Sequence, residues 1–319
     1  MLRSLYSGIA GLGTHRTKMD VIGNNIANVN TTGFKSSRTN FQDVLYQKIK
    51  SGGNSRNAAF IGTGVDVAGI STDFGQGATQ NTGRTLDLAI NGNGFFVVSD
   101  ADLVDASGAI KTFTNDGTGV DGIKGKYTRD GIMFIDKDGY IVNSNGLKLI
   151  GRIDDGNGSS DPKDDQYGAI RILLTDHNGD KLTVESINIG PDGTITGTYT
   201  NGDRIQFDDG SGTYRDPSGA GPFKNSVQIA IASFGNNEGL DKIGSNLYAE
   251  AKDVSGKAVY STAADMESVS VASGYLEMSN VDLSNEFVNM ITTQRGFQAN
   301  ARTITVSDQM LEELVNLKR

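Results

Sequence analysis

The sequence predicts a mainly β protein with α-helices at its two ends. Apolar residues recur at helical spacing in residues 2–30 and 282–317, and strand-like alternation fills most of the chain between them. Glycine supplies 42 of the 319 residues, roughly twice the usual share of ~7%, which is typical of chains with many tight turns. We therefore expect a discontinuous helical terminal domain of coiled-coil type, residues 1–30 and 282–319, plus two β-rich domains, one inserted into the other.

The N-terminal helix carries its apolar side chains at 3-4 heptad spacing, interrupted at Arg16 and Gly23. The residues predicted to act in subunit assembly are Leu5, Ile9, Leu12, Met19 and Ile26. Glycines at 8, 11, 13 and 23 each weaken a helix by ~1 kcal/mol relative to alanine, so we expect this helix to need a partner. The same glycines permit close backbone approach, and an ordinary core helix is the alternative interpretation.

Residues 31–75 are predicted to connect this helix to the β region. The helical pattern ends at Gly33–Lys35, Phe41–Tyr46 predicts a short amphipathic piece, and Ser51–Ser55 predicts a flexible loop.

An inner β domain is predicted for residues 76–150 and 223–281. The period changes to two from about residue 64, and Asn-Gly and Asp-Gly pairs separate the apolar runs, which predicts antiparallel hairpins. The expected strands are Val65–Val67, Leu86–Ile90, Phe95–Val98, Ile132–Phe134, Tyr140–Val142, Val227–Phe234 and Leu247–Ala251.

Residues 151–222 are predicted to form an outer β domain inserted into the inner one. All four prolines of the chain fall in this segment, and its turns are rich in Asp, Gly and Asn. The expected strands are Ile170–Leu174, Leu182–Ile189, Thr194–Tyr199 and Arg204–Phe207.

The C-terminal helix is the most regular segment, with a 4-3 apolar spacing over nearly five heptads. At 1.5 Å per residue it is roughly 54 Å long if unbroken. Asp282 or Ser284 is the expected N-cap, and Gln294 and Asp308 place polar groups at seam positions. The predicted assembly residues are Leu283, Phe287, Met290, Phe297, Ile304, Leu311 and Val315.

Charge and composition exclude several classes of protein. The formal charge is −9, and the acidic bulk of the chain argues against nucleic-acid binding. Cysteine is absent, so neither disulfides nor thiol chemistry are available. No apolar run approaches the ~20 residues of a membrane span. Glycines interrupt the apolar stretch at the N-terminus, so we expect any export to proceed without a cleaved signal peptide.

Catalytic, cofactor and metal sites are not predicted. The two histidines, His15 and His177, have no second histidine or cysteine nearby, and His15 is expected on the helix surface. Oxygen-bearing side chains alternate in Asp155–Ser159 and Asp176–Asp180, but both loops depart from the EF-hand pattern. Hairpin turns explain both loops, with weak calcium binding as the alternative.

Three terminal motifs carry a family resemblance. Met19–Lys35 resembles the N-terminal signature of bacterial flagellar rod and hook proteins, and Gly274–Ser284 with Phe287–Ile291 is similar to its C-terminal counterpart. The resemblance covers about residues 1–150 and 225–319. Matching segments in the middle are Asn81–Ile90, Gly94–Phe96, Tyr127–Gly131 and Phe234–Gly239.

This resemblance implies a structural subunit that self-associates into a hollow helical tube of the flagellum. Residues 151–222 are similar to the outer domain of hook proteins, and the ending Leu314–Leu317 is like theirs. Both favour the hook, a flexible universal joint that transmits torque from motor to filament. The distal rod is the alternative.

The implied partners are rod, hook-cap and hook-filament junction proteins and the flagellar export apparatus, of type III, with no nucleic acid or membrane. The implied location is extracellular, in the hook and basal body. From another class, a secreted β-domain module that binds calcium or a glycan through residues 151–222 is the competing hypothesis.

Overall fold

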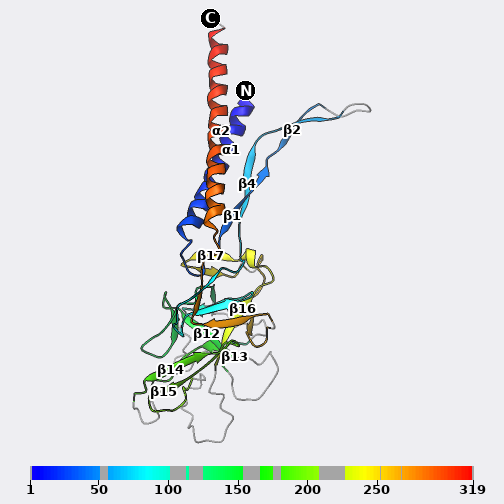
Figure 1. Ribbon diagram of the computed structural model, residues 1–319. Helices are drawn as coiled ribbons and strands as arrows, with labels where there is room; N and C mark the ends of the chain where they lie inside the picture. The colour runs from blue at the N-terminus through cyan, green and yellow to red at the C-terminus, as the bar shows by residue number, and fades with distance from the viewer. Residues whose placement is uncertain are drawn as a thin grey trace. The chain divides into compact units, whose positions relative to one another are not determined.

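The computed structural model describes residues 2–50, 57–100, 113–114, 125–153, 166–174, 181–207, 227–251, 253–266 and 268–317. The chain divides into two compact units. Unit 1 contains residues 1–30, 35–75 and 280–319, and unit 2 contains residues 31–34 and 76–279. The ribbon diagram colours both units by residue number (Figure 1).

Two long helices dominate unit 1: α1 (Leu2–Ala27) and α2 (Leu283–Asn316). Asp282 caps α2, because its side chain accepts hydrogen bonds from the backbone N–H groups of Ser284 and Asn285. The predicted terminal helices and their mainly β surroundings are confirmed. Among the described residues, no helix is long and apolar enough to cross a membrane.

A two-stranded ribbon completes unit 1. Strand β1 (Ser37–Asp43) pairs antiparallel with β4 (Val65–Thr72), and β2 (Tyr46–Lys50) pairs antiparallel with β3 (Ala59–Gly62). The backbone hydrogen bond from Val44 to Gly64 joins the two pairs. The sequence predicts a connecting segment here, with a strand only at Val65–Val67. The structure shows four strands, of which β4 contains that expected strand, and most of their side chains are exposed.

Unit 2 is built on antiparallel strands. Its large sheet follows the order β10-β11-β12-β16-β7-β9-β18-β17, with β8, β13, β14, β15 and β19 attached to it. Two further pairs join β20 to β6 and β21 to β5. The strands are β5 (Thr79–Asn81), β6 (Leu88–Asn91), β7 (Phe95–Ser99), β8 (Phe113–Thr114), β9 (Lys126–Thr128), β10 (Met133–Ile135), β11 (Ile141–Asn143), β12 (Lys148–Ile153), β13 (Gln166–Ala169), β14 (Val184–Ile189), β15 (Thr194–Tyr199), β16 (Val227–Ser233), β17 (Asp241–Gly244), β18 (Leu247–Ala249), β19 (Val259–Thr262), β20 (Ser270–Ser273) and β21 (Tyr275–Glu277), with a short 3₁₀ turn at Asn237–Gly239.

One hydrophobic cluster forms the core of unit 2. It joins residues of the predicted inner domain, such as Phe96 and Ile229, to residues of the predicted inserted segment, such as Ile172, Ile195 and Tyr199. Strand β15 also pairs directly with β16. The division into inner and outer domains therefore stays a prediction. The expected strands at 170–174 and 204–207 form isolated bridges.

Candidate assembly site on the terminal helices

The two helices of unit 1 pack against each other in antiparallel fashion (Figure 1). The hydroxyls of Ser4 and Ser307 lie 3.3 Å apart near one end of the pair. Near the other end, the Asn25 amide donates to the Glu286 carboxylate at 3.0 Å. The seam between these ends runs along small and polar positions of α1.

Glycines on each helix receive a side chain from the other helix. A methyl group added at Gly11 would lie 2.6 Å from the Nδ2 atom of Asn300, and one added at Gly296 would lie 2.7 Å from Cε1 of His15. At Gly8 it would lie 3.1 Å from Cγ1 of Ile304. Real Cβ atoms essentially never approach as closely as they would at Gly11 and Gly296, and the contact at Gly8 is tighter than most, so the absence of a side chain at these glycines makes room for the partner helix. The sequence pattern associated them with helix weakness and close approach, and the structure assigns them the second role.

His15 lies at the junction of α1, α2 and β1, which corrects its predicted place on the helix surface. Its ring packs edge-on against Phe41 of β1 at 5.9 Å between centroids. Its Nδ1 atom is buried without a hydrogen-bond partner. Burial lowers the pKa of His15, and the nearby charge of Lys18 lowers it further. The neutral imidazole is therefore the form that suits this contact.

The predicted assembly residues lie only partly in the seam. On α1, Leu5, Leu12, Met19 and Ile26 are half-buried and Ile9 is exposed. On α2, Met290, Ile304 and Leu311 are half-buried, and Ile304 lies against Gly8 of α1. The remaining four are exposed, with Phe287 51% and Val315 69% accessible; the other two are Leu283 and Phe297. The apolar row of α2 is thus half covered by α1 and half available to another molecule.

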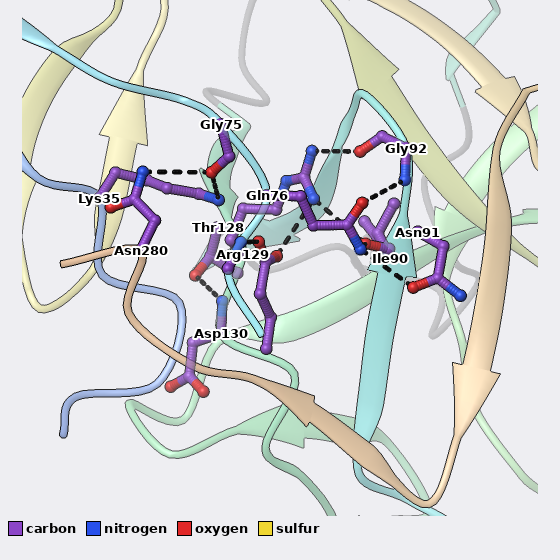
Figure 2. A network of polar contacts seen from close by, with 12 residues as sticks. Lys35, Gly75, Gln76, Ile90, Asn91, Gly92, Thr128, Arg129, Asp130 and Asn280 are labelled. Atoms are coloured by element: carbon purple, nitrogen blue, oxygen red, sulfur yellow. Dashed lines mark hydrogen bonds and ion pairs between the residues drawn. The ribbon is translucent and has the colours of Figure 1, made fainter. Parts of the chain in front are cut away.

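Polar contacts tie the helices to the ribbon and to the chain segments beside them. Asn25 donates to the carbonyl of Ser37 at 2.9 Å and accepts from its N–H at 3.0 Å. The carbonyl of Gly75 accepts from the Lys35 ammonium at 2.8 Å and from the Asn280 amide at 3.2 Å (Figure 2). These hydrogen bonds all lie at the end of the ribbon where Ser37 pairs with Thr72, so they fix that end of the ribbon against α1 and the segment before α2.

Unit 2 holds a buried ion pair of its own. Arg129 lies 3.1 Å from the Glu277 carboxylate, and the two side chains are 3% and 0% exposed. Arg129 also donates to the carbonyls of Ile90 and Gly92 (Figure 2). Glu277 accepts from the N–H of Gly77. Burial lowers the pKa of Arg129, and the Glu277 charge opposes that change. In the sequence, Arg129 lies in the family-like segment Tyr127–Gly131 and Glu277 lies in Gly274–Ser284. Nothing in the sequence pattern indicated that these two residues pair.

The candidate metal loops lie outside the part of the chain that the structure describes. This applies to residues 155–159 and 176–180 and to His177. Among the described residues, no group of three or more metal-ligating side chains occurs.

Comparison with known proteins connects both helices to one family. Residues 5–35 match the family described as flagella basal body rod protein. Residues 272–317 match the family described as the C-terminal part of flagellar basal body rod FlgEFG proteins. These matches cover α1 from Leu5 onward with the turn that follows it, and the end of β20 together with β21 and α2.

Full-length relatives agree with the terminal matches. The flagellar basal-body rod protein FlgG of Bacillus subtilis is 40% identical over 325 positions, with both chains covered completely. The flagellar hook protein FlgE of Borreliella burgdorferi is 29% identical over 466 positions, again with both chains covered. A crystal structure of the Helicobacter pylori hook protein FlgE2 gives a TM-score of 0.21 at 15% identity, over 52% of this chain and 38% of that one. Because full-length identity and both terminal matches coincide, the chain belongs to the family of flagellar rod and hook structural proteins.

Proposed function

We propose that this subunit polymerises through α1 and α2 into a helical tube. The observation that carries the proposal is the exposed apolar surface of unit 1. Most of the large exposed apolar side chains among the described residues lie there, and the exceptions in unit 2 are Phe134, Ile243, Val254, Val259 and Tyr275. Contiguous exposed apolar surface marks interaction sites, and head-to-tail contacts that do not close generate helical filaments.

Substitution of the uncovered row of α2 tests this proposal. In the double variant Phe287→Ser/Val315→Ser we expect the critical concentration for polymerisation to rise by at least about tenfold, because each large side chain contributes roughly 1.5–3 kcal/mol when buried. The measurement is sedimentation of polymer with electron microscopy of the pellet. Phe134→Ser, at a site of unit 2 that is 42% exposed, is the control. If the double variant has the same critical concentration for polymerisation as the wild type, the proposal is wrong.

Within the flagellum, we propose the hook as the place of this subunit. The resemblance of residues 151–222 to the hook's outer domain supports this, as does the ending Leu314–Leu317. Loop-rich, polar contacts between such outer segments suit the sliding that a bending tube requires. We also propose that the subunit meets rod, hook-cap and hook-filament junction proteins there.

The distal rod is the second candidate, and a specific observation favours it. The alignment with the Bacillus subtilis rod protein spans 325 positions, close to the 319 residues of this chain, whereas that with the Borreliella burgdorferi hook protein spans 466. Expression in strains lacking either the rod or the hook protein separates the two candidates. Restoration of curved hooks supports the first proposal, and restoration of the rod alone supports the second.

A further inference from the structure

The last turns of α2 extend beyond the start of α1. Because the helices are antiparallel and Ser4 lies opposite Ser307, Leu2 at the start of α1 lies near residue 309, and the residues from 310 on continue past the N-terminal end of α1 (Figure 1, red end). At 1.5 Å per residue, residues 310–317 form an overhang of about 12 Å.

This overhang combines apolar and acidic side chains. Met310, Leu314 and Leu317 recur at helical spacing and are 51%, 50% and 83% exposed. Glu312 and Glu313 lie among them, and Asp308 precedes them. No basic residue occurs between Arg302 and Lys318. The surface is therefore apolar with a negative charge.

The β2–β3 pair has the complementary character. Both strands expose nearly all of their side chains, including the apolar Tyr46, Ile49, Phe60 and Ile61. The charges of β2 are Lys48 and Lys50, and the sequence from 44 to 65 contains no acidic residue. Lys48 lies opposite Phe60, so these two side chains share a face of the ribbon. This surface is apolar with a positive charge.

We propose that the β2–β3 pair of one copy packs on the α2 overhang of another copy. The inference rests on the proposed function, since it names the contact that joins neighbouring subunits. Within one chain both surfaces are exposed, so neither covers the other. Between copies, the apolar side chains are buried against one another while the two lysines face the acidic groups, which gives the contact orientation as well as affinity.

A charge exchange tests the contact. Lys48→Glu/Lys50→Glu and Glu312→Lys/Glu313→Lys each turn attraction into repulsion, so each is expected to raise the critical concentration of polymerisation about tenfold. The chain that carries all four substitutions is expected to return to within about threefold of wild type. The contact is wrong if either pair alone is without effect or if the combined variant polymerises no better than the pairs.

Cysteine pairs give a second readout, because the natural chain contains no cysteine. In polymers of Phe60→Cys/Leu314→Cys, mild oxidation is expected to yield a ladder of disulfide-linked oligomers, and Phe134→Cys/Leu314→Cys, the control, is expected to yield none. Tubes without a ladder, or a cross-link within single chains, overturn this contact and leave the proposed function intact. If wild-type protein forms no polymer at all, the proposed function fails, and this inference fails with it.

Discussion

Single glycines decide how closely the terminal helices approach. Gly11 and Gly296 admit Asn300 and His15, respectively, whereas a methyl group added at Gly13 or Gly23 would meet no atom within 4 Å. We therefore expect glycine-to-alanine substitutions to change the free energy of unfolding in opposite directions, depending on whether the glycine faces the partner helix.

Alanine at these positions tests that difference. Overpacking costs about 1–3 kcal/mol and helix propensity returns at most ~1 kcal/mol, so Gly296→Ala is expected to lower the free energy of unfolding by about 1 kcal/mol. Gly13→Ala and Gly23→Ala, the controls, are expected to raise it by up to ~1 kcal/mol. Urea titration followed by helical circular dichroism measures both. Equal effects at seam and outer glycines contradict the proposed role of the seam.

His15 makes the stability of the helix pair depend on pH. Its pKa in the folded chain is lowered by burial and by Lys18, so the folded state favours the neutral ring. The unfolded chain takes up a proton below pH ~6.5, and stability is therefore lost as pH falls through that value towards the folded pKa.

We expect the unfolding free energy to fall below pH 6.5 by at most about 1.4 kcal/mol per pH unit from this residue. Urea titrations at several pH values measure it. His15→Gln is expected to remove this component, and His177→Gln, the control, to retain it. An unchanged pH profile in His15→Gln excludes His15 as the source.

The buried ion pair of unit 2 is expected to be sensitive to loss of one partner. Glu277→Gln leaves the charge of Arg129 buried without a counter-charge, so we expect a loss of about 3–5 kcal/mol. The double variant Arg129→Met/Glu277→Leu removes both charges and is expected to recover most of that loss. Thermal denaturation followed by tyrosine circular dichroism compares the variants. If the double variant is less stable than Glu277→Gln, the uncompensated charge is not the cause.

At the scale of the element, the cap of α2 is the simplest local determinant. Asp282 Oδ1 accepts from the N–H of Ser284 at 2.9 Å. Asp282→Ala is expected to destabilise the helix pair by about 1 kcal/mol, whereas Asp282→Asn, which keeps an accepting oxygen, is expected to cost less. Urea titration of the two variants measures the difference, and equal losses argue that the cap hydrogen bond is unimportant.

The elements that the sequence predicts well are those whose apolar period matches one buried face. Both terminal helices and strand β15 fall in this group, whereas β7 was predicted from a continuous apolar run because it is buried on both faces. Strands β1 to β3 of the ribbon were missed, and only the start of β4 was expected, because most side chains of the ribbon are exposed and burial imposes no alternation on the sequence. Strand β21 was missed because it is three residues long and pairs with the distant β5.

The same reasoning explains the partial prediction of the site. Apolar periodicity located the row from Phe287 to Val315, half of which remains exposed. It did not locate the seam on α1, because that seam consists of glycine, serine, histidine and asparagine. Small and polar residues that fit together across the seam produce no apolar periodicity in the sequence of either helix, so the seam could not be predicted from one helix alone.

At the scale of the whole molecule, apolar surface is divided unevenly between the two units. Unit 1 keeps most of its large apolar side chains exposed along the helices and ribbon, whereas unit 2 buries most of its own in one cluster. This contrast fits a subunit in which unit 1 supplies contacts between copies and unit 2 is stable by itself.

That single cluster leads to a prediction about residues 151–222. The described residues of the segment supply six side chains to the core: Ile170, Ile172, Ile189, Ile195, Tyr199 and Ile205. At roughly 1.5–3 kcal/mol each, their removal costs about as much as the whole stability of a domain, ~5–15 kcal/mol. We therefore expect deletion of the segment to unfold unit 2 rather than only to alter the curvature of a tube.

A matched pair of point variants tests the same packing without a deletion. Ile195 is completely buried and Ile243 is 53% exposed, and both belong to unit 2. Ile195→Ala is expected to lower the unfolding free energy by about 2–5 kcal/mol, because it leaves a cavity, whereas Ile243→Ala is expected to change it by less than about 0.5 kcal/mol. If Ile195→Ala and the deletion both leave the thermal transition of unit 2 unchanged, the segment is an independent outer domain, as the sequence pattern predicted. If both the Ile195→Ala variant and the deletion lower the stability of unit 2, residues 151–222 share one hydrophobic core with the rest of unit 2.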